Sequence, residues 1–369
     1  MNSDDGNAVV FNGSKLPLEK KEFSLPSNLG DDDALVEITL STVCGSDVHT
    51  WLGHRAFPTP CIMGHEMVGK IITMGKNLTT DYTGQKLAVG DKVVWSMTVA
   101  PPDCKCFFCK KKLPQKCTKM FKYGHVKSDQ QPHFTGGFAK YVQLKKGSYI
   151  FKVSSELSDE EVAPLMCAAS TITSGLDYGD FHECDYVIIQ GCGALGMYAC
   201  AFTKQLGGKK VIAIDVMDER LELAKQFGAD HIINAKNVGE NLLDEIMKIT
   251  EDRGADVIIE ITGEPSVIKE GIKMLRVGGT YILLGAIYPN NHVTLDSSDI
   301  ITKCLKIVGM HNYHPKHLET AIDLVLKTKD KYPYKKLVGP NFEFSAKGLE
   351  DAFKALDSKQ SLRPAINPN

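Results

Sequence analysis

The sequence has little that would suit a membrane, a nucleic acid or a secretory route. No apolar run is long enough to span a bilayer. Lysine and arginine (43) nearly balance aspartate and glutamate (45), so the net charge of −2 favours neither a nucleic-acid nor a membrane partner. The first residues, MNSDDGNAVVF, are acidic and polar, unlike a signal peptide. These absences predict a cytoplasmic protein.

The cysteines do not suit a disulfide framework, because their number, eleven, is odd and no secretory signal precedes them. Four fall in one short stretch, as metal ligands do: Cys104, Cys106, Cys109 and Cys117. Five others are interpreted as small packing residues, the common role of a free cysteine: Cys61, Cys184, Cys192, Cys200 and Cys304.

A chain of 369 residues predicts about two domains. Up to residue 168, short extended runs separated by glycine, proline and aspartate predict a compact β domain, for example 34–40, 67–73 and 92–95. Residues 169–308 instead alternate apolar strands with amphipathic helices, which indicates an α/β domain with a doubly wound parallel sheet. Residues 309–369 are expected to return to the first domain.

A glycine loop in the α/β region predicts a dinucleotide site. Gly191, Gly193 and Gly196 form G-x-G-x-x-G between a strand (186–190) and a helix (from 197), and Asp215 ends the next strand. Such glycines allow a tight turn, approach to a pyrophosphate and close helix packing. Asp215 would bind the ribose hydroxyls and repel a 2′-phosphate, which favours NAD over NADP. The remaining predicted cofactor contacts are Ala194, Leu195 and Arg220, and Arg220 could instead accommodate the phosphate of NADP.

Residues 41–66, STVCGSDVHTWLGHRAFPTPCIMGHE, carry most of a catalytic zinc site. Two thiolates and one imidazole form a known ligand set for alcohol oxidation, and a catalytic zinc keeps three protein ligands. The predicted ligands are Cys44, His65 and, from a distant segment, Cys167. The alternative is that these are buried packing residues.

Four further side chains in this stretch have predicted roles. Ser46 and His49 would relay the substrate proton. Asp47 is expected to orient an imidazole ligand. Glu66 is either a transient ligand or an electrostatic partner.

The four clustered cysteines would suit a second, structural zinc site. Asp103 stands one residue before Cys104, and either could supply the first ligand; a thiolate is preferred because soft ligands dominate such sites. The surrounding lysines are interpreted as a solvated surface: Lys105, Lys110, Lys111, Lys112, Lys116, Lys119, Lys122 and Lys127.

Together these motifs resemble the zinc-dependent alcohol dehydrogenases of the medium-chain dehydrogenase/reductase superfamily. The resemblance rests on C-G-S-D-x-H from Cys44, G-H-E from Gly64, the cysteine cluster, P-L-M-C from Pro164 and the glycine loop. It implies a GroES-like catalytic domain in two segments, a Rossmann NAD-binding domain between them, and hydride transfer in the cleft. Relatives are commonly homodimers or homotetramers. Within the superfamily, the residues around Lys122-Tyr-Gly-His125 look like the phosphonate-catabolism-associated alcohol dehydrogenases.

The prediction is therefore an NAD-linked zinc alcohol dehydrogenase acting on a small alcohol or carbonyl substrate. The alternatives are a zinc-free quinone or enone reductase of the same fold and a non-catalytic nucleotide-binding protein. Residues 280–286 are a candidate edge strand for joining subunits. The substrate pocket is expected to draw its walls from Trp51, Arg55, Phe57, Tyr288 and His311. Arg55 would there bind an anionic group, or else be a surface charge.

Overall fold

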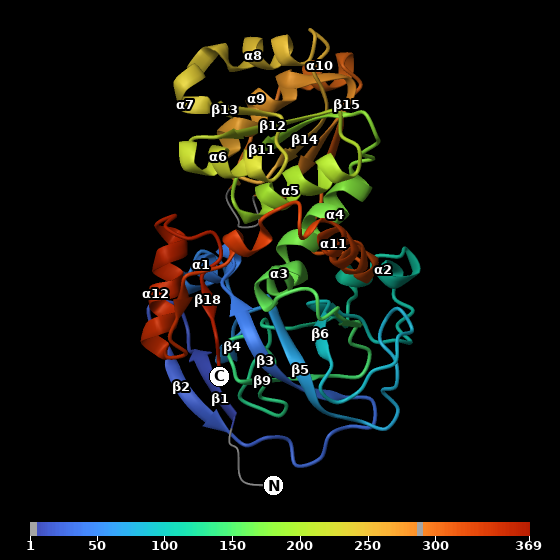
Figure 1. Cartoon of the computed structure of the whole chain (residues 1–369), viewed down its shortest axis with the longest axis vertical. Helices are drawn as coiled ribbons and strands as arrows, with labels where there is room; N and C mark the ends of the chain where they lie inside the picture. Colours follow the sequence, from blue (N-terminus) through green and yellow to red (C-terminus); the bar gives the residue numbers. More distant parts are fainter. Residues whose placement is uncertain (1–5, 286–290) are drawn as a thin grey trace. The chain divides into compact units, whose positions relative to one another are not determined.

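Strand β3 (Ala34–Thr42) is the centre of the main sheet in the first half of the chain. Seven of its nine residues are buried. It pairs antiparallel with β5 (Met67–Met74), with β9 (Tyr141–Leu144) and with β18 (Ala365–Ile366), which comes from the end of the chain. The computed structural model in which these pairs occur describes residues 6–285 and 291–369 (Figure 1).

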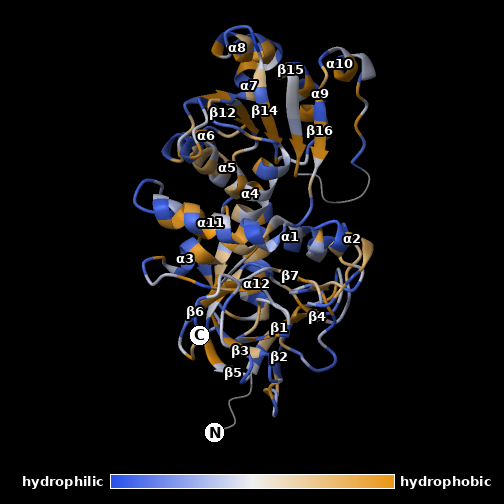
Figure 2. Cartoon of the chain, turned by 90° about the vertical axis from the view of Figure 1, so that its right-hand side faces the viewer, coloured by the Kyte–Doolittle hydropathy of each residue, from blue (hydrophilic) through white to orange (hydrophobic). Residues whose placement is uncertain are grey.

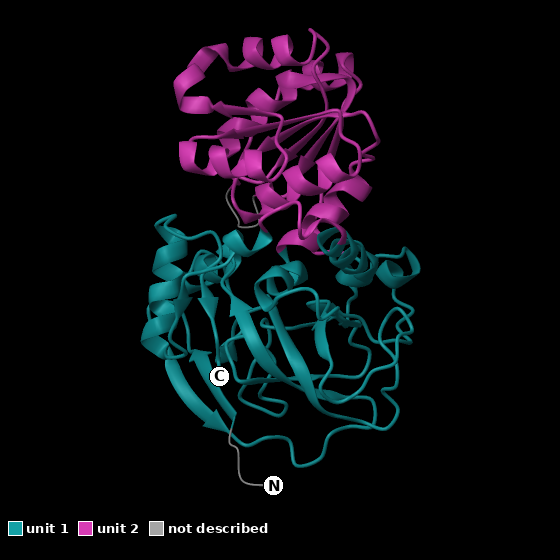
Figure 3. Ribbon diagram, in the orientation of Figure 1, with its two compact units in different colours: residues 1–167, 314–326, 334–369 teal, residues 168–313, 327–333 magenta. Residues whose placement is uncertain are grey.

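The described chain divides into two compact units (Figure 3). The first unit takes the chain up to Cys167 together with His314–Leu326 and Tyr334–Asn369, and the second takes Ala168–Tyr313 and Lys327–Pro333. The C-terminal part of the first unit starts at His314, and the short piece Lys327–Pro333 within it belongs to the second unit.

The first unit is mainly β structure. Its sheets have the orders β2-β1-β4, β10-β6-β5-β3-β18-β17 and β7-β8, with β9 beside β3. Its other strands are β1 (Gly6–Phe11), β2 (Glu19–Phe23), β4 (Cys61–Ile62), β6 (Lys92–Trp95), β7 (Thr98–Val99), β8 (Phe121–Lys122), β10 (Ile150–Lys152) and β17 (Asn341–Phe342). Its helices include α1 (Gly45–Trp51), α2 (Phe107–Lys110), α3 (Asp159–Val162) and α12 (Ala346–Asp357), and α11 (Pro315–Thr328) begins in it.

Helix α12 shows why the C-terminal segment returns to this unit. Its apolar side chains Leu349 and Phe353 are buried in one cluster with Phe11 and Phe138, residues of the first segment. A helix with a single apolar stripe has to cover that stripe with another element. The apolar stripe of α12 is thus covered by residues of the first segment of the chain.

The second unit is a parallel sheet flanked by helices. Its strands are β11 (Tyr186–Gln190), β12 (Lys210–Asp215), β13 (His231–Asn234), β14 (Ala255–Glu260), β15 (Leu275–Leu283) and β16 (Lys306–Gly309). Its helices are α4 (Ala168–Tyr178), α5 (Ala194–Gln205), α6 (Asp218–Gln226), α7 (Ala235–Val238), α8 (Leu242–Ile249), α9 (Pro265–Met274) and α10 (Ser297–Thr302). The strand order β13-β12-β11-β14-β15-β16 reads 3-2-1-4-5-6 along the chain, which is that of the Rossmann fold.

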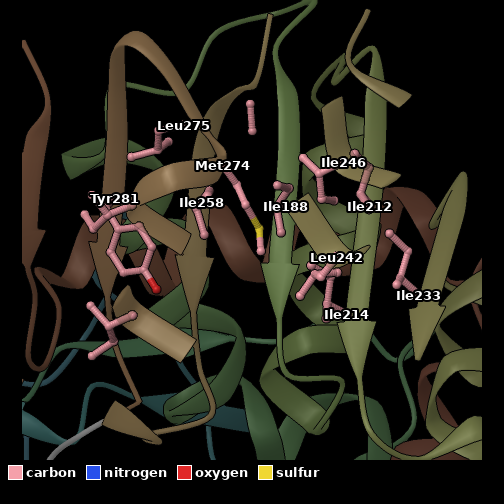
Figure 4. Close-up of a cluster of buried hydrophobic side chains, with 13 residues drawn as sticks. Ile188, Ile212, Ile214, Ile233, Leu242, Ile246, Ile258, Met274, Leu275 and Tyr281 are labelled. Carbon is pink, nitrogen blue, oxygen red and sulfur yellow. The ribbon is translucent and has the colours of Figure 1, made fainter. Parts of the chain in front are cut away.

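The apolar strands predicted from the sequence form the centre of this sheet. Ile188 and Ile258 are fully buried between neighbours from α8 and α9 (Figure 4). Figure 2 shows β14, whose six residues are all buried, as a largely hydrophobic ribbon. Strands buried on both faces need continuous apolar runs, which explains why they were recognisable in sequence.

Two expectations about the second unit are wrong. Residues 280–283 belong to β15, which lies between β14 and β16 and is not an edge; Ala286 and Tyr288 lie outside the described residues. Cys184 and Cys304 are exposed rather than packed, while Cys61, Cys192 and Cys200 are buried as expected. Both exposed cysteines lie in turns with positive φ (68° and 52°).

No helix in the described part of the chain is long and apolar enough to cross a bilayer.

Candidate metal and cofactor sites

The loop between β4 and β5 places His65 and Glu66 in the interior of the first unit. Gly64 has φ +91°, and a Cβ there would lie 3.1 Å from the backbone of Gly137. Only glycine accommodates both the conformation and this close approach. The first residue of the G-H-E motif therefore sets the path that turns the next two side chains inward.

The structure brings Cys44, His65, Glu66 and Cys167 together, with one ligand atom from each within 4.8 Å of the others. Cys44 is the N-cap of α1, and Cys167 follows the short 3₁₀ helix Ala163–Met166. Their sulfurs are 3.9 Å apart. Two sulfurs on one tetrahedral zinc, at Zn–S of about 2.3 Å, would be separated by roughly 3.8 Å. The donor set and this spacing fit zinc.

Asp47 holds two of these groups in place. Its Oδ1 lies 3.2 Å from His65 Nδ1, and its Oδ2 accepts the backbone N–H of Cys44 at 3.0 Å. Burial alone would lower the pKa of His65, but the charge of Asp47 and its hydrogen bond, with Cys44 adding to them, raise it to about 10. Because a metal binds only the deprotonated ring nitrogen, zinc would displace a proton here.

The sulfurs of Cys44 and Cys167 are hydrogen-bond partners. A hydrogen bond from Cys167 holds the pKa of Cys44 well below its usual range, and the same bond raises the pKa of Cys167. The lowered pKa favours the thiolate form of Cys44. A thiolate is the form that binds zinc.

Glu66 is paired on one oxygen only. Its Oε2 accepts from Thr42 Oγ1 at 2.6 Å and lies 3.0 Å from Arg363 Nε. Its Oε1 is buried and has no hydrogen-bond partner among the described residues. Burial raises the pKa of Glu66 to about 7, although Arg363 opposes this. The buried Oε1 of Glu66, which lies beside two sulfurs and an imidazole, is therefore available to a metal ion.

Sequence reasoning missed Arg363, because no local pattern links residue 363 to Glu66.

Ser46 and His49 lie three residues apart on α1, so both point from the same side of the helix. Ser46 Oγ is 3.3 Å from His65 Nε2. His49 Nδ1 is 3.2 Å from Nδ1 of His54, an exposed residue in the following loop. Burial first, and then the charge of His54, lower the pKa of His49. His49 is therefore a neutral imidazole at pH 7, able to accept a proton.

The second cluster brings together the sulfurs of four cysteines of the first unit, Cys104, Cys106, Cys109 and Cys117. Cys117 Sγ is 3.3 Å from Cys104 Sγ and 4.0 Å from Cys106 Sγ. A disulfide would need about 2.05 Å, so these are free thiols. Backbone N–H groups of Cys109 and Thr118 lower the pKa of Cys106 to about 5, which favours the thiolate. Asp103 is exposed and stands outside the cluster, whereas Cys104 is within it.

In the second unit, the glycine loop connects β11 to α5. Gly191 has φ +104°, and a Cβ on Gly196 would lie 2.2 Å from the carbonyl oxygen of Gly191. A Cβ on Gly193 would meet nothing within 4 Å, so this position is open to a ligand. Gly191 thus allows the tight turn, Gly193 leaves room for a pyrophosphate, and Gly196 allows the close packing of the helix.

Asp215 ends β12 beside this loop. Its Oδ2 accepts the N–H of Cys192 at 2.7 Å, and its Oδ1 accepts those of Val216 and Met217 at 2.7 and 3.0 Å. Ala194 and Leu195 open α5, and Arg220 lies in the first turns of α6. The carboxylate therefore ties the loop after β11 to the loop after β12.

Trp51 is one of the residues expected in the wall of the substrate pocket. It packs on Phe353 of α12, with ring centroids 5.4 Å apart, in the core described above. Lys122, assigned to the surface from sequence, is only partly exposed. Burial, followed by the charge of Arg55, lowers the pKa of Lys122 to about 8.

Comparison with known proteins agrees with this architecture. Residues 30–155 match the model of the alcohol dehydrogenase GroES-like domain, and residues 194–327 match that of the zinc-binding dehydrogenases. A 5-exo-hydroxycamphor dehydrogenase from Pseudomonas putida is 30% identical over 343 residues, covering 90% of this chain and 91% of the relative. A sorbitol dehydrogenase from Bacillus subtilis is 28% identical, covering 98% and 97%.

Solved structures extend the similarity to the whole chain. The crystal structure of an alcohol dehydrogenase from Thermotoga maritima superposes with a TM-score of 0.91 at 30% identity, covering 99% of this chain and 100% of the other. Given the two matched domains and these full-length relatives, the chain belongs to the zinc-binding dehydrogenases with a GroES-like domain.

Proposed function

We propose that the protein is an NAD-linked, zinc-dependent alcohol dehydrogenase. The observation that carries the proposal is the buried cluster of Cys44, His65 and Cys167, with a carboxylate oxygen of Glu66 that has no hydrogen-bond partner among the described residues. Zinc held there would supply a Lewis acid that polarises the substrate oxygen. The net reaction converts an alcohol and NAD⁺ to a carbonyl compound, NADH and a proton.

The residues of α1 would handle the proton. Ser46 Oγ, beside His65, is placed to hydrogen-bond the substrate hydroxyl and take its proton. His49, neutral at pH 7, would receive the proton next. His54, exposed and 3.2 Å from His49, would then pass it to solvent.

NAD is the proposed cofactor because of Asp215. Its carboxylate stands at the end of β12 and is held by three backbone N–H groups. A fixed negative charge there would bind ribose hydroxyls and repel a 2′-phosphate. Arg220 is the residue that would weaken this preference.

We further propose that the protein is a homodimer or homotetramer, which analytical ultracentrifugation would measure. Membership of the phosphonate-catabolism-associated group of these enzymes stays a prediction.

The test combines metal content with turnover. Purified protein is assayed with a panel of primary and secondary alcohols and with NAD⁺ or NADP⁺, for the wild type and for Cys167→Ala. The proposal expects zinc-dependent NADH formation that Cys167→Ala abolishes, with kcat/KM higher for NAD⁺. A folded, zinc-free protein that instead reduces quinones or enones would replace it with the reductase alternative. Absence of any turnover together with cofactor binding would favour a non-catalytic role.

A further inference from the structure

Glu260 is a fully buried acid at the end of strand β14 in the second unit. From β11 the chain proceeds outward to β12 and β13, and then returns to β14 on the other side of β11. Dinucleotides bind outside the carboxyl ends of the strands at such a switch point. Glu260 pairs with Gln190, the last residue of β11, so it lies at this place in the sheet.

Backbone hydrogen bonds of the sheet continue for one residue beyond β14 and β15. The N–H of Ile261 donates to the carbonyl oxygen of Gln190 at 2.9 Å, and the N–H of Leu284 donates to that of Glu260 at 3.0 Å. These bonds fix the start of the loop after β14 and the start of the loop after β15. The order of the residues that follow depends on other acceptors.

The carboxylate of Glu260 supplies those acceptors to both loops. Its Oε1 accepts from the hydroxyl of Thr262 and from the N–H of Gly263, each at 2.7 Å. Its Oε2 accepts from the N–H of Gly285 at 3.3 Å. A buried carboxylate is costly unless donors surround it, and here the donors come from two different loops. One side chain therefore ties the loop after β14 to the loop after β15.

The loop after β14 also lies against the candidate cofactor loop. A Cβ on Gly191, the first glycine of that loop, would lie 3.0 Å from Thr262 Cγ2. A Cβ on Gly285 would lie 2.3 Å from the backbone nitrogen of Gly263. The three segments are thus in close contact at the carboxyl end of the sheet. A change in the loop after β14 would change the shape of the candidate cofactor site.

The position of these loops in the sheet indicates which part of a dinucleotide they would meet. A doubly wound sheet has two halves, each of which binds one mononucleotide. Asp215 ends β12 in the first half, and an acid there binds the ribose that carries the extra phosphate in NADP, which is the ribose of adenosine. The second half, with β14 and β15, is left for the nicotinamide mononucleotide.

We propose that Glu260 is a positioning residue for the nicotinamide half of the cofactor, because its carboxylate orders the loops after β14 and β15 before the cofactor binds. The inference rests on the proposed function, which supplies the dinucleotide. Without this carboxylate, binding would have to order Gly263 and Gly285 itself. Fixing the backbone of one residue lowers an affinity by a factor of about 5–30.

The experiment compares two probes, NADH and ADP, of which ADP contains only the adenosine half. Fluorescence titration gives the affinity for NADH and calorimetry gives that for ADP, in the wild type and in Glu260→Gln. Glutamine has the same size, but one of its terminal atoms is an NH₂ group that donates instead of accepting. The substitution therefore withdraws an acceptor from one loop without leaving a cavity.

Asp256→Asn is the matched control. Asp256 is a second buried acid of β14, but it lies near the other end of the strand. Its Oδ2 accepts the N–H of Tyr186 at 2.8 Å, and its carboxylate pairs with Arg253 and Arg276. Loss of these contacts should lower the melting temperature, while the ratio of NADH affinity to ADP affinity keeps its wild-type value.

Glu260→Gln is expected to weaken NADH binding about 5–30-fold and to leave ADP binding unchanged. Thr262→Val removes one donor to the carboxylate at an exposed position, so it should fold even if Glu260→Gln does not. It should show a smaller loss, again for NADH only. Equal weakening of NADH and ADP in Glu260→Gln would mean a general structural role and overturns the proposal, as does unchanged NADH affinity.

The wild type separates failure of this inference from failure of the proposed function. Because both probes are measured without turnover, a protein that oxidises no alcohol still tests the role of Glu260. A wild type that binds neither NADH nor NADPH rejects the dinucleotide and both proposals with it. A wild type that binds NADH as tightly as Glu260→Gln does retains the cofactor and rejects only the positioning role.

Discussion

His65 Nδ1 lies 3.2 Å from Asp47 Oδ1, and both side chains are only 3% exposed. The other oxygen of the same carboxylate accepts the N–H of Cys44. One buried side chain thus orients two candidate zinc ligands that lie on different elements, the start of α1 and the loop before β5. The short spacing between Cys44 and Asp47 makes this possible, because an N-cap residue and the third residue of its helix face each other.

Asp47→Asn is therefore expected to weaken zinc binding about 10–100-fold, the usual effect of removing a partner that orients a ligand. The substitution also lowers the pKa of His65, which offsets part of the loss at neutral pH. Zinc affinity is measured by competition with a chromogenic chelator. Asp31→Asn, which removes an exposed ion pair with Lys76, is the control. Equal affinity in all three proteins would show that Asp47 has no such role.

The two cysteine clusters should bind metal independently. We expect two zinc ions per chain in the wild type, and one in either Cys167→Ala or Cys117→Ser, because each substitution removes one ligand from one cluster. Zinc is measured by atomic absorption. Cys104→Ala should also lose an ion while Asp103→Ala should not, since Asp103 stands outside the cluster. A wild-type content of one, lost in Cys167→Ala, would mean that the second cluster holds no zinc.

Arg363 and Glu66 form an ion pair whose side chains are 5% and 0% exposed. Arg363→Met leaves a buried carboxylate without its partner, so the free energy of unfolding should fall by about 3–5 kcal/mol. Urea denaturation measures the change. The double variant Arg363→Met/Glu66→Gln removes both charges and should regain part of the loss. If the double variant is as unstable as the sum of the two single variants, the pair is not coupled.

The glycine loop offers a matched pair of substitutions. A Cβ at Gly196 would be 2.2 Å from the carbonyl oxygen of Gly191, whereas one at Gly193 meets no protein atom within 4 Å. Gly196→Ala should therefore lower both thermal stability and NADH affinity. Gly193→Ala should leave the melting temperature near the wild-type value and still weaken NADH binding, because the methyl group occupies the space for the pyrophosphate. Unchanged NADH affinity in Gly193→Ala would place the cofactor elsewhere.

The histidine pair on and after α1 has a pH signature. Burial, and then the charge of His54, lower the pKa of His49 below 6.5. His54→Gln removes the second cause, so the pKa of His49 should rise. Since proton acceptance needs the neutral ring, the acid limb of kcat/KM for alcohol oxidation should move to higher pH. NMR titration of the His49 ring measures the pKa without turnover. A pKa that stays in place or falls would contradict the interaction.

The sequence by itself determined those features that depend on local spacing. The apolar runs of the sequence and their alternation with amphipathic helices identified the strands of the second unit, because strands buried on both faces need unbroken apolar runs. The glycine loop was recognisable because its turn, its open position and its helix contact fall within six residues. The stretch from Cys44 to Glu66 revealed its chemistry because its donor residues stand close together in the chain.

Only the tertiary structure decided what depends on distant segments meeting. Arg363 comes to Glu66 because α12 and β18 return to the first unit, and no local pattern near residue 363 signals this. Lys122 reads as one of many surface lysines, yet the pairing of β8 places it near Arg55 and the thiols. Cys184 and Cys304 resemble buried cysteines in sequence but lie in exposed turns. Burial and charge environment are set by the packing of the whole chain, so residue type and spacing alone do not specify them.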